Sequence, residues 1–424
     1  MKRLLKLNFA SASKLLVASA FAVTCSAAIL SSCSDDDLGP SIFDPTDYPL
    51  DRSAYTFPLD SFCKQYYLEP YNLQYLFKMR DISSDMDYNL VPCSYDQSIT
   101  LAVLCKYLWF DVYKDSVGDG DLFLKKYSPR IIHVIGSPAY NPATHTEELG
   151  LAEGGLKITL YNGNNLSPND IEYMNEMFFK TMHHEFSHIL NQHVNRPTDF
   201  DLISNGKYDV QNWQDTHDSI ALGRGFVSPY ASKQPREDWV EVIANYIVKD
   251  TITWNRMLNT ASYEWELAED VPAEYWDKIN RLANQGKADR DSVGYYFSTT
   301  AKSGTAASTY GIVRKVIQRD ANGYAVPDAS GNIVFTHRSG VNGRDIILQK
   351  LDMAREWLLT SFNYDIEKIR MGVQHRQWVT DAKGNFVFDD KGRFINNLTY
   401  KRADGTTVLD SLRSQVLRLQ SLKK

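Results

Sequence analysis

The stretch TMHHEFSHILNQH, residues 181–193, places four histidines and one glutamate in an otherwise apolar run. Within this run and the residues before it, large apolar side chains recur at helical intervals. Ser167, Pro168 and Asp170 are typical of a helix start, with Ser167 as the N-cap. The sequence therefore predicts one long helix, over about residues 168–192, that carries the histidines.

On such a helix, a spacing of four residues brings His184 and His188 onto one face, with their Cβ atoms about 5–6 Å apart. Both imidazoles can then bind one metal ion, and Glu185 can lie beside a water molecule and act as a general base. Catalytic zinc sites combine three protein ligands with one open position, so this HExxH motif requires a third ligand. The simpler interpretation of the pattern is a polar helix face without a metal.

Two places in the sequence offer the third ligand. The pattern HExxHxxGxxH would need a glycine in place of Asn191 and a histidine in place of Val194, so His193 is one residue out of position. The other place is EDWVE, where Glu237 and Glu241 lie four residues apart on a predicted helix. One carboxylate could bind the metal while the other accepts the free ring N–H of a ligating histidine. A solvated acidic helix face is the alternative.

Two segments together, HEFSH at 184–188 and GFVSPYASKQPREDWVEVIANYI at 225–247, resemble the gluzincin metallopeptidases. The resemblance is to a zinc peptidase family of import-associated surface lipoproteins and, more distantly, to the catalytic domain of anthrax lethal factor. It implies that Glu237 is the third zinc ligand and that Glu241 supports a ligating histidine. It also implies that Tyr230 points at the substrate carbonyl, where a phenol would stabilise the developing oxyanion.

The resemblance implies an α+β protein with a zincin-like fold, in which a mixed sheet and its edge strand pack on the histidine helix within residues 58–195. The alternation in GGLKITLYN, residues 154–162, predicts this edge strand, with one face in solvent. A helical part over residues 196–300 would carry Glu237. Residues 301–424 would be helical with short β-hairpins, which the Asp/Gly turns of DASGNIVF and DAKGNFVF predict.

The N-terminus has the features of an export signal. MKRLLKLNFASASK carries four basic residues and no acid, and an apolar stretch too short to span a membrane follows. The tetrapeptide LSSC resembles a bacterial lipobox, which implies that residues 1–33 direct export and that Cys33 becomes the lipidated first residue. Residues 34–57 are acidic and contain prolines, as expected of a flexible tether. A plain secretory signal with a chance cysteine is the alternative.

The acidic residues after Cys33 resemble surface-export signals of outer-membrane lipoproteins. They imply a protein that is lipid-anchored in the outer membrane and exposed at the cell surface. The formal net charge of -6 provides no basic field for nucleic acid, which is therefore not an expected partner.

Motif and resemblance together predict a metallopeptidase that uses Zn²⁺ to hydrolyse a peptide or protein substrate, with a TonB-dependent importer as a further partner. In this prediction His184, His188 and Glu237 bind the metal, and Glu185 and Tyr230 act on the substrate. Two alternatives stay open: a non-catalytic binding lipoprotein for such an importer, and a zinc amidase that acts on a non-protein substrate.

Overall fold

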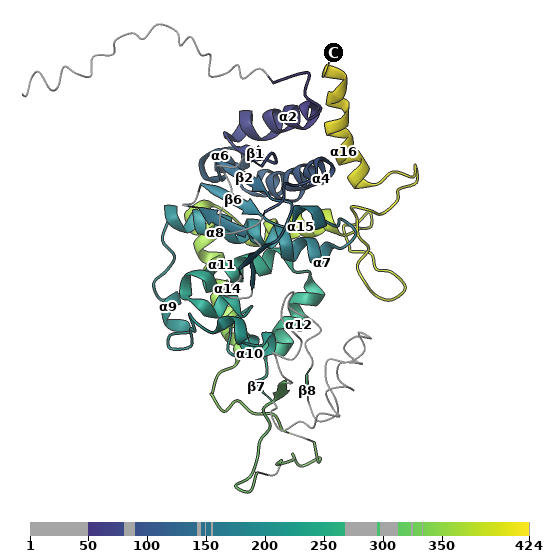
Figure 1. Cartoon of the computed structure of the whole chain (residues 1–424). Helices are drawn as coiled ribbons and strands as arrows, with labels where there is room; N and C mark the ends of the chain where they lie inside the picture. The colour runs from purple at the N-terminus through teal and green to yellow at the C-terminus, as the bar shows by residue number, and fades with distance from the viewer. Residues whose placement is uncertain are drawn as a thin grey trace, which may run out of the picture. The chain divides into compact units, whose positions relative to one another are not determined.

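The described part of the chain begins at residue 50, within the predicted tether. The computed structural model describes residues 50–79, 90–141, 146–148, 150–153, 156–267, 295–296, 313–323, 325–332 and 334–423 (Figure 1). The predicted signal peptide with Cys33, and residues 34–49 of the predicted tether, lie outside these residues. Residues 52–424 form one compact unit. Among the helices of the described residues, none has the length and apolar character of a membrane span.

The histidine-bearing helix is present, but it starts later than the sequence predicts. It consists of α7 (Ile171–Met174), a single π turn (Asn175–Phe179) and α8 (Lys180–His193). The N-cap is Asp170, whose side chain accepts a hydrogen bond from the backbone N–H of Tyr173. The prediction of Ser167 as N-cap was therefore wrong by one turn. The apolar face of the helix is fully buried and consists of Met174, Phe178, Phe179, Met182, Phe186 and Leu190.

A small mixed sheet lies against this helix. Its strands are β1 (Gln74–Leu76), β2 (Ile131–Val134), β6 (Lys157–Leu160) and β5 (Gly150–Glu153), in the order β1-β2-β6-β5. The first three are parallel, and β5 pairs with β6 in the antiparallel direction. Both β5 and β6 contact α8. The predicted mixed α/β class is thus confirmed.

The edge strand is not the one that the sequence analysis assigned. Within the described residues, β6 lies between β2 and β5, so GGLKITLYN forms an inner strand and β5 forms the edge. The predicted solvent face of this segment is wrong as well, because Thr159 and Tyr161 are buried together with Ile158 and Leu160. β6 pairs in parallel with β2, and parallel strands are commonly buried on both faces.

The second predicted helix, α11 (Pro235–Val248), packs along α8. Proline at its first position and acidic residues in its first turn are favourable at a helix N-terminus. α14 (Gly343–Phe362) and α15 (Ile366–Gln377) pack against α11 on its other sides. Figure 1 shows α8, α11 and α14 side by side, and their apolar residues belong to one core that extends from Leu59 to Val416.

Shorter elements surround this centre. The remaining described helices are α2 (Phe57–Cys63), α3 (Glu69–Tyr71), α4 (Tyr95–Cys105), α5 (Asp111–Ser116), α6 (Gly120–Tyr127), α9 (Phe200–Ile203), α10 (Asp218–Gly223), α12 (Thr251–Ala261) and α16 (Val408–Leu417). The remaining described strands are β3 (Ala139–Asn141) with β4 (Thr146–Glu148), and β7 (Trp265–Leu267) with β9 (Val313–Lys315) and β8 (Tyr295–Tyr296). Further π turns occur at Lys64–Leu68 and Lys106–Phe110.

The Asp/Gly turns of the C-terminal region form tight hairpins. Asp381 accepts backbone hydrogen bonds from Lys383 and Asn385 at 2.8 and 2.9 Å, and Gly384 adopts φ +83°. Single bridges on either side, such as Thr380 with Phe386, complete the hairpin. The aspartate closes the turn and the glycine permits the left-handed backbone, as this sequence pattern predicts.

Candidate metal centre

His184 and His188 project from one face of α8. Their ring centroids lie 4.9 Å apart, with the ring planes at 81°. Both side chains are almost completely buried, with 7% of each residue exposed. The i,i+4 spacing on a regular helix produces this pairing, as the sequence analysis expected.

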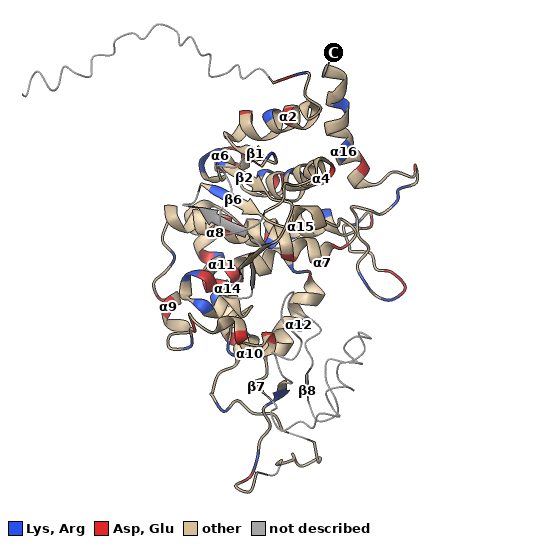
Figure 2. Cartoon of the chain, in the orientation of Figure 1, with Lys and Arg blue, Asp and Glu red and all other residues tan. Residues whose placement is uncertain are grey.

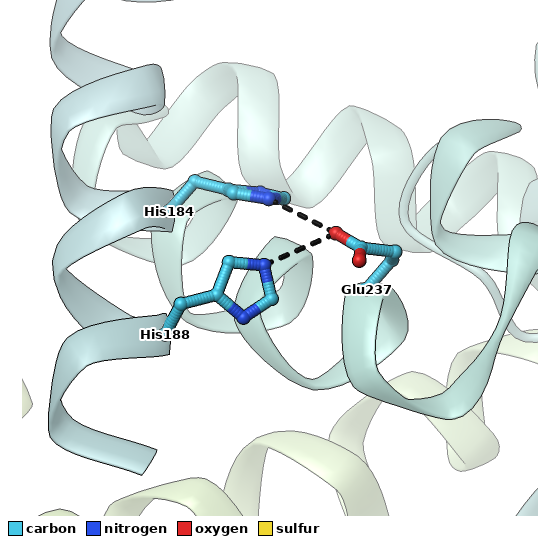
Figure 3. Close-up of side chains that lie close together, drawn as sticks. All are labelled: His184, His188 and Glu237. Carbon is cyan, nitrogen blue, oxygen red and sulfur yellow. Dashed lines mark hydrogen bonds and ion pairs between the residues drawn. The ribbon is translucent and has the colours of Figure 1, made fainter. Parts of the chain in front are cut away.

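Glu237 meets both histidines from the first turn of α11. Its Oε2 atom lies 3.2 Å from Nε2 of His184 and 3.2 Å from Nε2 of His188. Figure 3 shows the two imidazoles of α8 directed at this carboxylate. Ligand atoms of these three buried residues all lie within 4.8 Å of one another.

The donor set fits a zinc ion. Zinc binds imidazole nitrogen and carboxylate oxygen at about 2.0–2.2 Å in a tetrahedron, so two of its ligand atoms lie about 3.3 Å apart. The two N–O separations of 3.2 Å therefore correspond to tetrahedron edges. Two histidines and one glutamate also leave a fourth position open, as catalytic zinc sites require.

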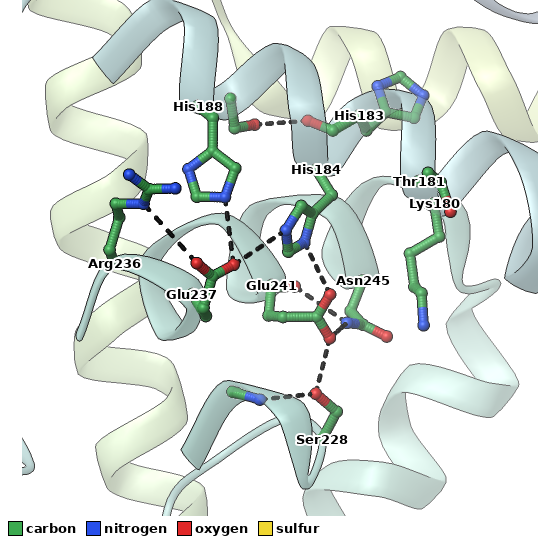
Figure 4. Close-up of polar contacts among 12 residues, drawn as sticks. Lys180, Thr181, His183, His184, His188, Ser228, Arg236, Glu237, Glu241 and Asn245 are labelled. Carbon is green, nitrogen blue, oxygen red and sulfur yellow. Dashed lines mark hydrogen bonds and ion pairs between the residues drawn. The ribbon is translucent and has the colours of Figure 1, made fainter. Parts of the chain in front are cut away.

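Glu241 contacts His184 from the side opposite Glu237. Its Oε1 lies 2.8 Å from Nδ1 of His184. Its Oε2 accepts hydrogen bonds from Ser228 Oγ at 2.6 Å and Asn245 Nδ2 at 3.1 Å, so the carboxylate is held at both oxygens (Figure 4). With Nδ1–H donating to this carboxylate, a neutral His184 would direct its Nε2 lone pair toward the position between His188 and Glu237.

The electrostatics of the cluster favour a cation. Burial lowers the pKa of His184, but its hydrogen bonds to Glu237 and Glu241 outweigh burial and raise the pKa to about 10. Burial lowers the pKa of His188. Burial would raise the pKa of Glu237, yet the two imidazoles hold it well below its usual range. The carboxylates of Glu237 and Glu241 thus favour a proton, and with it a positive charge, on the two imidazole rings. A bound metal ion would provide that positive charge instead, and both rings would then be neutral.

Glu185 lies in the same turn of α8 and is 8% exposed. Burial raises the pKa of its carboxyl group, and His184 opposes the shift. Within the described part of the chain, this carboxylate forms no hydrogen bond or ion pair with another side chain. A buried carboxylate beside the ligands, with its oxygens free, can accept a proton from water.

Tyr230 lies beside the ligands in a short 3₁₀ turn, Tyr230–Lys233. Its ring centroid is 5.9 Å from that of His184 and 4.9 Å from that of Trp213, which meets it edge-on. Burial and the nearby carboxylates raise the pKa of the phenol, so the hydroxyl stays protonated and can donate a hydrogen bond.

His193, the alternative third ligand, is located elsewhere. It is exposed at the last position of α8, where its ring packs edge-on against Tyr127. It does not belong to the group formed by His184, His188 and Glu237.

A buried ion pair supports the first turn of α11. Asp238 Oδ2 lies 2.6 Å from Nζ of Lys350 in α14, and both side chains are 0% exposed. Lys350 also donates to the carbonyl oxygen of Gly225 at 2.7 Å, and the hydroxyl of Tyr208 donates to Asp238 at 2.9 Å. Burial raises the pKa of Asp238 and lowers that of Lys350. Lys350 therefore connects α14 both to the turn that carries Glu237 and to the segment that leads to Tyr230.

Several of these supporting residues were not predicted from the sequence. Asn245 lies four residues after Glu241, so helical spacing could have indicated it. Ser228 reaches Glu241 from a loop, and Lys350 reaches Asp238 from a helix more than a hundred residues away. Contacts of this kind have no local sequence signal.

Comparison with known proteins identifies one matching family. A family model described as "Putative zinc-binding metallo-peptidase" matches residues 53–367, which include all the residues of the cluster. The chain is also similar to a solved structure described as a putative zinc-binding metallo-peptidase from Bacteroides caccae ATCC 43185. The identity is 29%, the match covers 74% of this chain and 90% of that chain, and the TM-score is 0.49. No curated protein matches the chain.

Proposed function

The chain belongs to the family described as "Putative zinc-binding metallo-peptidase", and from this membership we propose that it is a zinc-dependent peptidase of the gluzincin type with a zincin-like fold. The observation that supports this most directly is the buried group of His184, His188 and Glu237 beside Glu185, whose carboxylate has no side-chain partner among the described residues. A site for structural zinc would have no chemical need for such a carboxylate, and it would fill all four positions with protein ligands.

His184, His188 and Glu237 would hold the metal. When bound, zinc supplies Lewis acidity, which lowers the pKa of a water molecule to about 7 and polarises an acyl carbonyl. Glu241 keeps His184 in the tautomer that directs Nε2 toward the other two ligands.

Glu185 and Tyr230 would act on the reacting groups. Glu185 accepts a proton as the water oxygen attacks the carbonyl carbon. It then delivers that proton to the amine nitrogen as the C–N bond breaks. Tyr230 donates its O–H hydrogen bond to the carbonyl oxygen while negative charge develops there.

We also propose a cellular location for the protein. The basic N-terminus, the apolar stretch and LSSC support an outer-membrane lipoprotein anchored through Cys33 and exposed at the cell surface. Hydrolysis at that surface would supply short peptides to a TonB-dependent importer. Radiolabelled palmitate should be incorporated into the wild-type protein and not into Cys33→Ser; equal labelling of both would exclude this anchor.

The test of the enzyme is metal content and hydrolysis measured on the same preparations. Elemental analysis should find about one zinc per chain in the wild type and in Glu185→Gln, and much less in Glu237→Ala. Peptide hydrolysis, followed by mass spectrometry, should occur only in the wild type.

Each alternative gives a different result. Hydrolysis retained by Glu185→Gln would refute the proposed mechanism. Zinc retained by Glu237→Ala would show that another residue is the third ligand, and His193 would be tested first. Zinc binding with hydrolysis of non-peptide amides alone would identify an amidase, and peptide binding without any hydrolysis would identify a binding lipoprotein.

A further inference from the structure

Two cationic side chains flank the metal cluster on the segment YASKQPRE, residues 230–237. Arg236 immediately precedes Glu237, and its side chain is 62% exposed. Its Nε lies 3.6 Å from Glu237 Oε1, which is too long for a hydrogen bond. Figure 4 shows the guanidinium group on the His188 side of Glu237. Its remaining N–H groups have no carboxylate partner within the described residues.

Lys233 lies over the ring of Tyr230. Its Nζ is 5.2 Å from the centroid of the Tyr230 ring, and this cation–π contact is its main interaction among the described residues.

Other lysines close to the site form ion pairs at hydrogen-bond distance, and Lys249 shares the Glu176 carboxylate with Lys180. Lys180 forms an ion pair with Glu176, and Lys350 forms one with Asp238. Arg236 differs from them because its ion-pair partner, Glu237, lies beyond hydrogen-bond distance at 3.6 Å, and Lys233 forms no ion pair with a carboxylate of the described residues. Figure 2 shows acidic and basic segments next to each other around α11.

The two cations change how the charges of the site act on an anionic substrate. Glu185, Glu237 and Glu241 together outweigh a divalent metal ion, so these groups alone would repel an anionic substrate. Arg236 and Lys233 reverse the sign of the local charge.

An arginine with free N–H groups is well suited to bind a carboxylate through two parallel hydrogen bonds. We propose that Arg236, assisted by Lys233, binds a carboxylate of the substrate close to the hydrolysed bond, so that the preferred substrates are acidic peptides. This inference rests on the proposed peptidase function. The carboxylate belongs either to an Asp or Glu side chain or to the free C-terminus of the peptide, and the experiment separates these two sources.

The test compares the binding of three short peptides, each with an acetylated N-terminus. The first alternates Ala and Glu and has an amidated C-terminus. The second replaces every Glu with Gln and is also amidated. The third is the Ala/Gln peptide with a free C-terminus. Alternation places a carboxylate at every second position, so no knowledge of the binding register is needed.

Binding is measured by calorimetry on the full-length, zinc-loaded Glu185→Gln protein, in which turnover is blocked. At least one carboxylate-bearing probe should bind about 10 to 100 times more tightly than the amidated Ala/Gln peptide. Adding Arg236→Gln should abolish most of that difference, and adding Arg236→Glu should reverse it. The preference should also decrease as salt is added.

Arg256→Gln is the matched control because it removes the same charge from an exposed position on α12, where Arg256 contacts only Thr253 among the described side chains. It should leave the preference unchanged. Equal binding of all three probes, no binding of any probe, or equal effects of Arg236→Gln and Arg256→Gln would overturn the inference.

Hydrolysis of the same probes by the wild type is a separate result. Hydrolysis without a preference for carboxylates would overturn the inference while the proposed peptidase function stands. Carboxylate-selective binding without hydrolysis of any peptide would instead support recognition by Arg236 and count against the peptidase.

Discussion

Replacing Lys350 with methionine should destabilise the protein strongly, and the structure gives the magnitude. Lys350 is completely buried, and its ammonium group contacts Asp238 at 2.6 Å and the carbonyl oxygen of Gly225 at 2.7 Å. Methionine fills a similar volume, but it leaves the Asp238 carboxylate buried without a counter-charge. Breaking a buried pair in this way costs about 3–5 kcal/mol.

The buried Asp238 carboxylate can avoid part of that cost by binding a proton. Keeping a carboxyl group of ordinary pKa protonated costs about 4 kcal/mol at pH 7 and about 1.5 kcal/mol at pH 5, and this sets an upper limit to the loss of stability. In the variant the folded state binds a proton that the unfolded state releases, so the pKa of Asp238 is raised on folding. Stability is then lost as pH rises, and the difference between Lys350→Met and the wild type should be larger at pH 7 than at pH 5.

Urea denaturation of the metal-free protein, followed by tryptophan fluorescence, measures this difference without a contribution from metal binding. The double variant Asp238→Asn/Lys350→Met should recover much of the loss because it contains no buried charge. Lys249→Met is the control: Lys249 pairs with Glu176 at a partly exposed site and should cost at most about 1 kcal/mol. A loss below about 1 kcal/mol in Lys350→Met, equal at both pH values, would refute the reasoning.

Four further predictions concern the metal centre and its helix. Glu241→Gln should weaken zinc binding about 10- to 100-fold in a chelator competition, because His184 loses its charged partner; unchanged affinity would contradict this role. The acid limb of kcat/KM should lie above 4.5, the ordinary value for a glutamate, because burial raises the pKa of Glu185 and its protonation removes the base; a limb below 4.5 would argue against it. Tyr230→Phe should lower kcat about 100- to 1000-fold with little change in KM, and a normal kcat would remove the phenol from the mechanism. Asp170→Ala should cost about 1 kcal/mol in urea denaturation through loss of the N-cap, whereas Ser167→Ala should cost less than about 0.5 kcal/mol.

The sequence could predict the metal cluster because its geometry depends mainly on helical spacing. His184 and His188 lie four residues apart on one helix, and Glu237 and Glu241 have the same spacing on another. Each pair is therefore fixed by local structure. The meeting of the two helices is a tertiary contact, and only the resemblance to a known family indicated it.

The errors of prediction also have physical causes. Alternation along residues 154–162 describes which side chains share a face and carries no information on which strands pair. The position of β5 at the edge was therefore not predictable from it. Ser167 and Asp170 are both good N-caps, but residues 167–170 form a turn in which the N–H of Asp170 donates to the carbonyl oxygen of Ser167 at 3.1 Å, and the helix starts after it.

The π turn at Asn175–Phe179 has a consequence for comparing relatives of this chain. A π turn corresponds to one extra residue in an α-helix, and one residue of an α-helix accounts for a rotation of about 100°. A relative without the π turn has one residue fewer between the N-cap and the HExxH motif, and it keeps the metal-binding face in place by repacking the turn between them. Sequence alignments of the family should therefore show single-residue gaps inside this helix, upstream of the HExxH motif, where insertions and deletions are otherwise rare.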